Sequence, residues 1–269
     1  MHRLSSTRRR WLPRFACSLI LLAPALAAEP QPSISPLPLL QPGPLACPEN
    51  QLAPFSAEYE VYRNGRKLGQ SVATLKKAGN LWLYEVDTEA EKGLAGFLGG
   101  QVEERSRFQV LGSELRPVEY QYQQGISLSR RKGVAHFDWD RLVITGTYKK
   151  KDFELPLVKS QTDRTLVNLK LMRALAQGEQ KIKFDTVERG RVKRMDFVRH
   201  DAQELLDSPE GRLDTVRVSR QHDNPKRHTD SWHAPQLGYL AIRMRHEDGD
   251  DDEVIEMRLV RWERGDCRV

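Results

Sequence analysis

An acidic segment near the C-terminus offers the densest group of chemically active side chains. Residues 246–257 read HEDGDDDEVIEM, and five of the six residues from 247 to 252 are acidic. Closely spaced carboxylates are ligands that Ca²⁺ prefers, but the calcium-loop pattern requires glycine where Glu253 stands and glutamate where Leu259 stands. We therefore predict a charged hairpin tip and no metal site, and leave open whether the tip binds a cation weakly.

Residues suited to catalysis do not form a recognisable motif. The segment GISLS at 125–129 lacks the second glycine of a G-x-S-x-G nucleophile elbow. The histidines show no compact metal-binding pair, and the odd spacing of His228 and His233 places them on opposite faces of a strand. We predict no catalytic residue and no cofactor. A carbohydrate-active enzyme stays a third alternative, because its carboxylates would come from distant strands.

A glycine-rich apolar segment, KGLAGFLGG at 92–100, is the strongest candidate for ligand contact. Flexible glycines beside Phe97 and Leu98 are typical of a flap that covers an apolar ligand. Trp82 and Tyr84 alternate on one face of the preceding strand pattern, so we predict a ligand-binding surface formed by these four residues. A buried connection whose glycines serve tight turns would have the same composition.

The N-terminus has the pattern of an export signal. Five arginines precede or border an apolar stretch that ends in Ala-Leu-Ala-Ala at 25–28, small residues that a signal peptidase accepts. We predict a signal peptide over 1–27 and periplasmic localisation. Both Sec and twin-arginine export fit the pattern. The stretch is too short for a stable membrane span, so we expect no transmembrane segment in the mature chain.

Removal of the signal changes the charge of the protein. The whole chain has 43 basic and 37 acidic side chains, and the signal contains five of the basic and none of the acidic ones, which leaves 38 against 37. The mature chain is thus nearly neutral, and we expect no nucleic-acid partner.

Two cysteines, Cys47 and Cys267, remain after the signal is removed. An even pair in an exported protein predicts a disulfide, with two free thiols as the alternative. Residues 28–53 contain many prolines, which favour an extended conformation and cannot build a core. We predict a proline-rich linker there, followed by a β-rich periplasmic domain over 54–269.

Most of that domain alternates between apolar and polar residues with the period of a β-strand. Strand patterns occur at 81–88, 115–123, 141–149, 181–188, 191–198 and 214–220, and turn patterns at 138–141 and 188–191. Asp138 and Asp140 flank Trp139 there, an arrangement known from sugar sites, but a turn is the preferred interpretation. One helix is expected near 166–177, with Thr162 or Asp163 at its start and Gly178 at its end.

Two hairpins can be placed from the pattern. Asn64-Gly65 predicts a type I′ turn that pairs Val61 with Leu68. A turn at 249–250 would pair Met244 with Ile255. The sequence therefore predicts a mainly β fold, a large curved antiparallel sheet or open barrel of ten or more strands with one packed α-helix, because so wide a sheet is disfavoured when flat.

Four segments resemble an exported Gram-negative family known as domain of unknown function 3108: YEVYRNGRKLGQ at 59–70, LRPVEYQYQ at 115–123, VNLKLMRALAQG at 167–178 and SWHAPQLGYLAIRMRHEDG at 231–249. The resemblance spans roughly residues 54–262 and implies a periplasmic β-rich protein, with no catalytic residues to carry over. We predict a non-catalytic protein that binds an apolar, lipid-like ligand or an envelope component. A protein-interaction or scaffold module for envelope assembly is the alternative.

Overall fold

The computed structural model describes residues 52–91, 100–126 and 129–265. All of them belong to the second of two compact units, which comprise residues 1–41 and 42–269. Within the described residues, one sheet contains every strand and one α-helix accompanies it. The strands are β1 (Phe55–Arg63), β2 (Arg66–Ala78), β3 (Leu81–Ala90), β4 (Gln101–Leu111), β5 (Glu114–Ile126), β6 (Ser129–Asp138), β7 (Val143–Tyr148), β8 (Lys151–Pro156), β9 (Gln161–Asp163), β10 (Lys181–Glu188), β11 (Arg191–Ser208), β12 (Gly211–Gln221), β13 (Arg227–Ala234), β14 (Leu240–Asp248) and β15 (Glu253–Arg264).

The order of the strands explains how one chain builds so wide a sheet. It runs β8-β7-β6-β5-β4-β3-β2-β1-β15-β14-β13-β12-β11-β10-β9, so nearly all neighbours are consecutive hairpins. The first and last strands pair with each other in the middle, and β9 pairs with β10 in parallel. The sheet ends at β8 on one side and β9 on the other. The predicted fold class, an open barrel-like antiparallel sheet with one helix, is confirmed.

The β1–β2 hairpin confirms the predicted turn and corrects its register. Asn64 and Gly65 both have positive φ, 48° and 78°, as a type I′ turn requires. However, Val61 pairs with Gly69 and not with Leu68, because the register shifts between Val61 and Tyr62. The prediction was wrong by one residue, because the extra residue of a β-bulge reverses which side chains of β2 point inward: Ser71 and Ala73 are buried, whereas Gln70 is exposed.

The acidic hairpin also has a different register from the predicted one. Met244 pairs with Met257 and not with Ile255, and Asp248 faces Glu253 across a turn over residues 249–252. The wider turn keeps the same residues on each face, because the shift is two residues.

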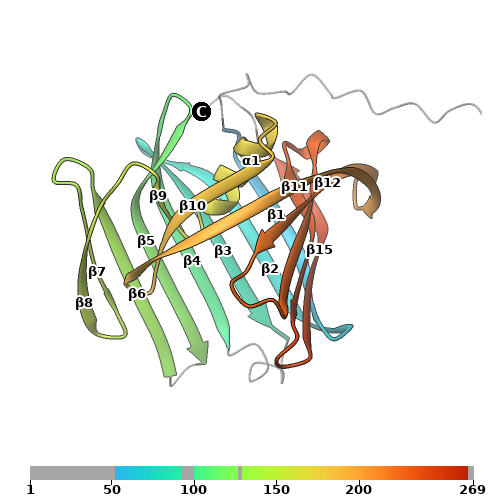
Figure 1. Ribbon diagram of the computed structural model, residues 1–269, viewed down its shortest axis with the longest axis horizontal. Helices are drawn as coiled ribbons and strands as arrows, with labels where there is room; N and C mark the ends of the chain where they lie inside the picture. The colour runs from blue at the N-terminus through green and yellow to red at the C-terminus, as the bar shows by residue number, and fades with distance from the viewer. Residues whose placement is uncertain (1–51, 92–99, 127–128, 266–269) are drawn as a thin grey trace, which may run out of the picture. The chain divides into compact units, whose positions relative to one another are not determined.

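The helix α1 (Val167–Ala176) lies inside the curl of the sheet (Figure 1). At its start, Leu166 and Leu169 pack into the main core with side chains from β1–β5 and β14–β15. On another side, Leu171 and Leu175 pack against Val218 of β12, together with Ile182 of β10. We call the sheet face that points toward α1 the inner face. The helix therefore stabilises the curl by contacting both halves of the sheet.

Side chains pack between β10, near one end of the sheet, and β5–β7, near the other end. We call this region the seam. Val187 of β10 packs with Tyr120 and Tyr122 of β5, and this cluster also contains Ala135, Phe137, Ile144 and Leu157. Apolar burial of this kind stabilises by about 25 cal/mol per Å². The sheet thus stays open, because no backbone ladder joins β8 to β9 in the described chain, but side-chain packing holds β10 against β5–β7.

Several predictions concern residues outside the described ranges. These are the signal peptide over 1–27, the linker up to residue 51, the segment 92–99 with Phe97 and Leu98, and the disulfide between Cys47 and Cys267. They stay predictions. Within the described ranges, no helix has both the length and the apolar character needed to cross a membrane.

Candidate functional site

Two of the four predicted ligand-binding residues lie in the main hydrophobic core. Trp82 and Tyr84 of β3 are 7% and 4% exposed and share a cluster with Leu166 and Leu169 at the helix. Their alternation on one face is as predicted, but α1 packs over the same core. Whether they contact a ligand stays a prediction.

The inner face continues beyond the part that α1 covers. Val86 follows Tyr84 on the same face of β3, and Met257 pairs with both Val61 and Met244. Val86, Val102, Met244 and Met257 are all partly exposed. We call these four residues the apolar strip. Val86 and Met257 also pack against the main core, and Thr88, Ser71 and Tyr59 lie in the strands between the valines and the methionines.

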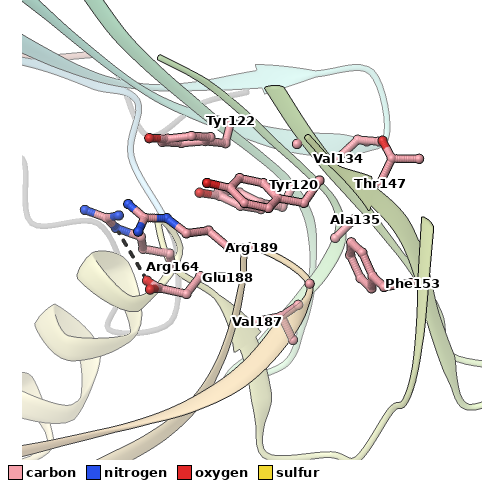
Figure 2. A pocket seen from close by; sticks show the side chains of 13 residues that line it. Tyr120, Tyr122, Val134, Ala135, Thr147, Phe153, Arg164, Val187, Glu188 and Arg189 are labelled. Carbon is pink, nitrogen blue, oxygen red and sulfur yellow. Dashed lines mark ion pairs between the residues drawn. The ribbon is translucent and has the colours of Figure 1, made fainter. Parts of the chain in front are cut away.

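A polar cluster lies beside the apolar strip, where the seam closes. Figure 2 shows a small pocket whose lining includes the side chains of Tyr120, Tyr122, Arg164, Glu188 and Arg189. The hydroxyl and charged ends of these side chains gather on one side, while Val187, Ala135 and Phe153 form an apolar wall. The pocket has a volume of about 10 Å³, which is room for roughly one water molecule. It is therefore too small to enclose an acyl chain.

Two carboxylates share one guanidinium at the centre of this cluster. Arg164 Nε lies 3.7 Å from Glu104 Oε1 and 3.9 Å from Glu188 Oε2. The Tyr120 hydroxyl donates to Glu104 Oε1 at 2.7 Å. The Glu104 carboxylate raises the pKa of Arg164. This is the arrangement of an ion-pair network, since both carboxylates are held by the same cation.

The tyrosines of the cluster keep their protons. Burial raises the pKa of Tyr120, and the nearby Glu104 carboxylate raises it further. Burial also raises the pKa of Tyr122, whose hydroxyl donates to Gln124 Oε1 at 2.5 Å and hydrogen-bonds with Arg189. Neither hydroxyl can serve as a general base near neutral pH. Both are suited to hydrogen bonding.

Asp163 fixes the backbone from which Arg164 projects. Its Oδ2 accepts a hydrogen bond from Ser106 Oγ of β4 at 2.6 Å, and its Oδ1 accepts the N–H groups of Thr165 and Leu166 at 2.9 and 2.7 Å. Burial raises the pKa of this carboxyl to about 6. Asp163 therefore joins β9 to β4 and holds the two backbone N–H groups just before α1, but the N-cap position is Leu166, which makes no side-chain cap hydrogen bond, and not Thr162 or Asp163 as predicted.

The histidines form structural contacts. His222 Nε2 and His246 Nδ1 each lie 2.7 Å from Thr229 Oγ1. His233 is buried, and its Nδ1 donates to the Tyr239 carbonyl at 2.8 Å, while His228 is exposed. No group of three or more histidine, cysteine, aspartate or glutamate side chains in the described residues could hold a metal ion.

The acidic hairpin tip receives its counter-charges from the neighbouring strand. Arg227 Nε lies 2.9 Å from Asp248 Oδ2, and Lys226 Nζ lies 2.9 Å from Asp250 Oδ1. Asn224 also donates to Asp250 at 2.6 Å. These contacts relieve the repulsion that the sequence pattern suggested, and they explain the charged tip without a bound cation.

The family model described as "Protein of unknown function (DUF3108)" matches residues 58–259. The chain belongs to this family. None of the curated proteins compared with the chain matches it. The family description assigns no reaction, so the chemistry of this DUF3108 domain has to be argued from its own residues.

Solved structures support the fold of the DUF3108 domain. A β-barrel-like protein of domain of unknown function DUF1849 from Brucella abortus has a TM-score of 0.53 at 12% identity and covers 80% of this chain and 99% of its own. A Parabacteroides distasonis protein proposed to be a lipoprotein has a TM-score of 0.32 at 9% identity, over 79% of this chain and 96% of its own. A Bacteroides fragilis protein with a YmcC-like fold, proposed to be exported, has a TM-score of 0.34 at 9% identity, over 79% of this chain and 97% of its own. The first likeness shows a shared fold, and the other two are too weak to carry an argument.

The sequence analysis missed the polar cluster at the seam. Its members come from β4, β5, the residue after β9, the end of β10 and the β10–β11 turn. A usable signal was present in β4, where Glu104 occupies the same face as Ser106 and Phe108, which are both fully buried. An ionisable residue in an inward position of a strand needs a partner, and this partner is Arg164.

Proposed function

We propose that this DUF3108 domain is a non-catalytic binding protein that holds an apolar, lipid-like ligand on the inner face of its sheet. The observation that carries the proposal is the apolar strip, because partly exposed valine and methionine side chains continue the inner face beyond the helix-covered core. Methionine is well suited to such a surface, since its flexible thioether adapts to irregular apolar groups.

Because the seam pocket is so small, an acyl chain has to bind outside it. An acyl chain would lie along the apolar strip, with one side against the sheet. Trp82 and Tyr84 would then support the strip from the adjoining core, and Phe97 and Leu98 would be the candidates to cover the ligand. The proposal locates the protein in the periplasm on the support of its basic and apolar N-terminus.

Native mass spectrometry of protein purified from its own periplasm tests this function. We expect a bound species of lipid mass, and an emission shift of the neutral probe Nile red on mixing with the delipidated protein. The absence of both would refute the proposal. A matched pair of variants on β15 localises the site: Met257→Glu on the apolar strip should abolish the shift, and Val260→Glu at an exposed position should preserve it. If the Met257→Glu variant does not fold, the milder Met257→Ser variant is tested in its place, with the same expected loss of the shift.

A scaffold function is the second candidate, and the outer face of the sheet favours it. Arg243 and Arg258 both contact Glu256, at 2.6 and 3.0 Å, and Lys67 contacts Glu60 at 2.8 Å. Glu256 itself is buried, and the partly exposed arginines and lysine around it present alternating charge that would select a protein partner of complementary charge. Crosslinking followed by pull-down distinguishes the two functions: a stoichiometric protein partner without bound lipid would support the scaffold.

A further inference from the structure

We propose that the polar cluster at the seam recognises the anionic head group, a carboxylate or phosphate, of an amphiphilic ligand whose tail lies on the apolar strip. The inference rests on the proposed function and names the chemical class of its ligand. The following contacts and charges support it.

The cluster brings several guanidinium groups together. Arg164 contacts the carboxylates of Glu104 and Glu188, and Arg189 projects toward the same side of the pocket (Figure 2). Arg220 follows buried Val218 on the inner face of β12 and interacts electrostatically with Glu188, Asp223 and Arg164. Three guanidinium groups therefore lie among the carboxylates of Glu104, Glu188 and Asp223, and together offer the planar N–H donors that an anionic head group would need.

The hydrogen-bonding capacity of Arg220 is incompletely used. Arg220 Nε is buried and has no hydrogen-bond partner among the described residues. The separations of 3.7 and 3.9 Å around Arg164 are longer than the 2.7–2.9 Å or so of a direct charge-assisted hydrogen bond. Unpaired buried donors are costly, and a planar carboxylate or a phosphate group matches the guanidinium fork.

The neighbouring inner wall carries the same sign of charge. His222 is close to Arg220, Lys193 and Arg227, and burial together with these cations lowers its pKa to about 4. Arg220 and Lys193 thus extend the row of cationic side chains from the seam along the inner face, while Arg227 is already paired with Asp248. Charges of one sign in a partly enclosed site attract oppositely charged ligands.

The apolar strip begins beside this cluster. Val86 of β3 pairs directly with Glu104 of β4, and Val102 lies two positions from Glu104 on the same face. Val102 also packs against the seam cluster that contains Tyr120 and Tyr122. A ligand with its head near Arg164 would therefore place its tail on valine and methionine side chains. The pocket holds only about one water molecule, so the head group would lie at its mouth.

Competition between Nile red and amphiphiles with one common tail tests the inference. Dodecanoate and dodecyl phosphate carry an anionic head, and dodecanol carries a neutral one. We expect delipidated wild-type protein to prefer each anionic compound over dodecanol by about tenfold or more. Raising the salt concentration should reduce this preference, since mobile ions screen partly exposed charges.

Neutral substitutions identify the residues responsible. Arg220→Gln and Arg164→Gln should each remove most of the preference for the anionic heads and leave the affinity for dodecanol unchanged. Arg212→Gln is the matched control, because its side chain is 67% exposed on an ion pair with Asp207. It should behave like the wild type. Circular dichroism checks that each variant is folded. If Arg164→Gln does not fold, Arg220→Gln alone tests the inference.

The outcomes separate the two proposals. Equal affinity for all three amphiphiles would overturn the head-group inference and leave the binding of an apolar ligand intact. Failure of all three to displace Nile red from the strip would refute the apolar-ligand function itself. Displacement by inorganic phosphate as effective as by dodecyl phosphate would also overturn the inference, because the site would then bind a free anion.

Discussion

Replacement of Asp163 tests how the buried carboxylate couples stability to pH. In Asp163→Ala, the N–H groups of Thr165 and Leu166 and the hydroxyl of Ser106 lose their acceptor. A buried donor without a partner costs about 1–3 kcal/mol. Asp163→Asn keeps one oxygen for the two N–H groups, so we expect it to be more stable than the alanine variant by about 3 kcal/mol.

The asparagine variant also isolates the ionisation of Asp163. Burial raises the pKa of the carboxyl from 3.8 to about 6 in the folded protein, so the folded state binds the proton more tightly than the unfolded state. The resulting stabilisation is fully present below pH 3.8 and is lost as the pH rises through 6. The shift corresponds to about 3 kcal/mol, of which about 2 kcal/mol should appear between pH 7 and pH 4.5.

Urea unfolding followed by tryptophan fluorescence from pH 4.5 to 7.5 measures this effect. The difference in unfolding free energy between wild type and Asp163→Asn isolates Asp163, because the other titrating groups are common to both proteins. We expect the wild type to gain about 2 kcal/mol relative to the variant as the pH falls. Parallel pH profiles would refute the coupling, and equal stability of the alanine and asparagine variants would refute the role of the backbone hydrogen bonds.

Three further substitutions, with Val260→Ala as a control, test other parts of the fold by the same unfolding measurement. Burial lowers the pKa of His233 from 6.5 to about 4. The neutral imidazole therefore stabilises the folded protein above pH 6.5, and this stabilisation is lost as the pH falls toward 4. His233→Gln should reduce this acid-induced loss of unfolding free energy by up to about 3 kcal/mol, and an unchanged acid profile would contradict the prediction. Phe108→Ala empties a fully buried site and should cost about 3–5 kcal/mol, whereas exposed Val260→Ala should change stability by less than about 0.5 kcal/mol; similar losses would contradict the assigned core. Gly146→Ala would place its Cβ 2.1 Å from the Val134 carbonyl oxygen and should cost about 1–3 kcal/mol, and a neutral effect would show that β6 and β7 lie further apart.

The sequence pattern predicted the elements of the fold better than their register. Alternation identified the strands around Tyr84, Tyr120 and Val218, and turn chemistry located Asn64-Gly65. A β-bulge shifts register by one residue without a compositional signal, so the pairing of Val61 was predicted wrongly. The acidic hairpin shifted by two residues, because counter-charges from Lys226 and Arg227 on a different hairpin support a wider turn.

The site was harder to predict than the fold. Trp82 and Tyr84 attracted attention as aromatic residues in alternation, and the structure places both in the core. Aromatic side chains in strands serve packing as often as binding, and the sequence does not reveal which segment covers them. Arg164 and Glu104 are 60 positions apart and meet only because the sheet curls. Residues brought together by curvature leave no local spacing to recognise.

The pairing of β1 with β15 has a consequence for how the chain acquires its structure. Arg63 contacts Glu253, 190 positions later in the chain. One edge of β1 therefore stays unpaired until the C-terminal strand β15 has been synthesised. Two separate meanders, β1–β8 and β10–β14, can assemble from local hairpins before that. We expect their union to be the slow step, during which the unpaired edge of β1 is open to mispairing with other chains.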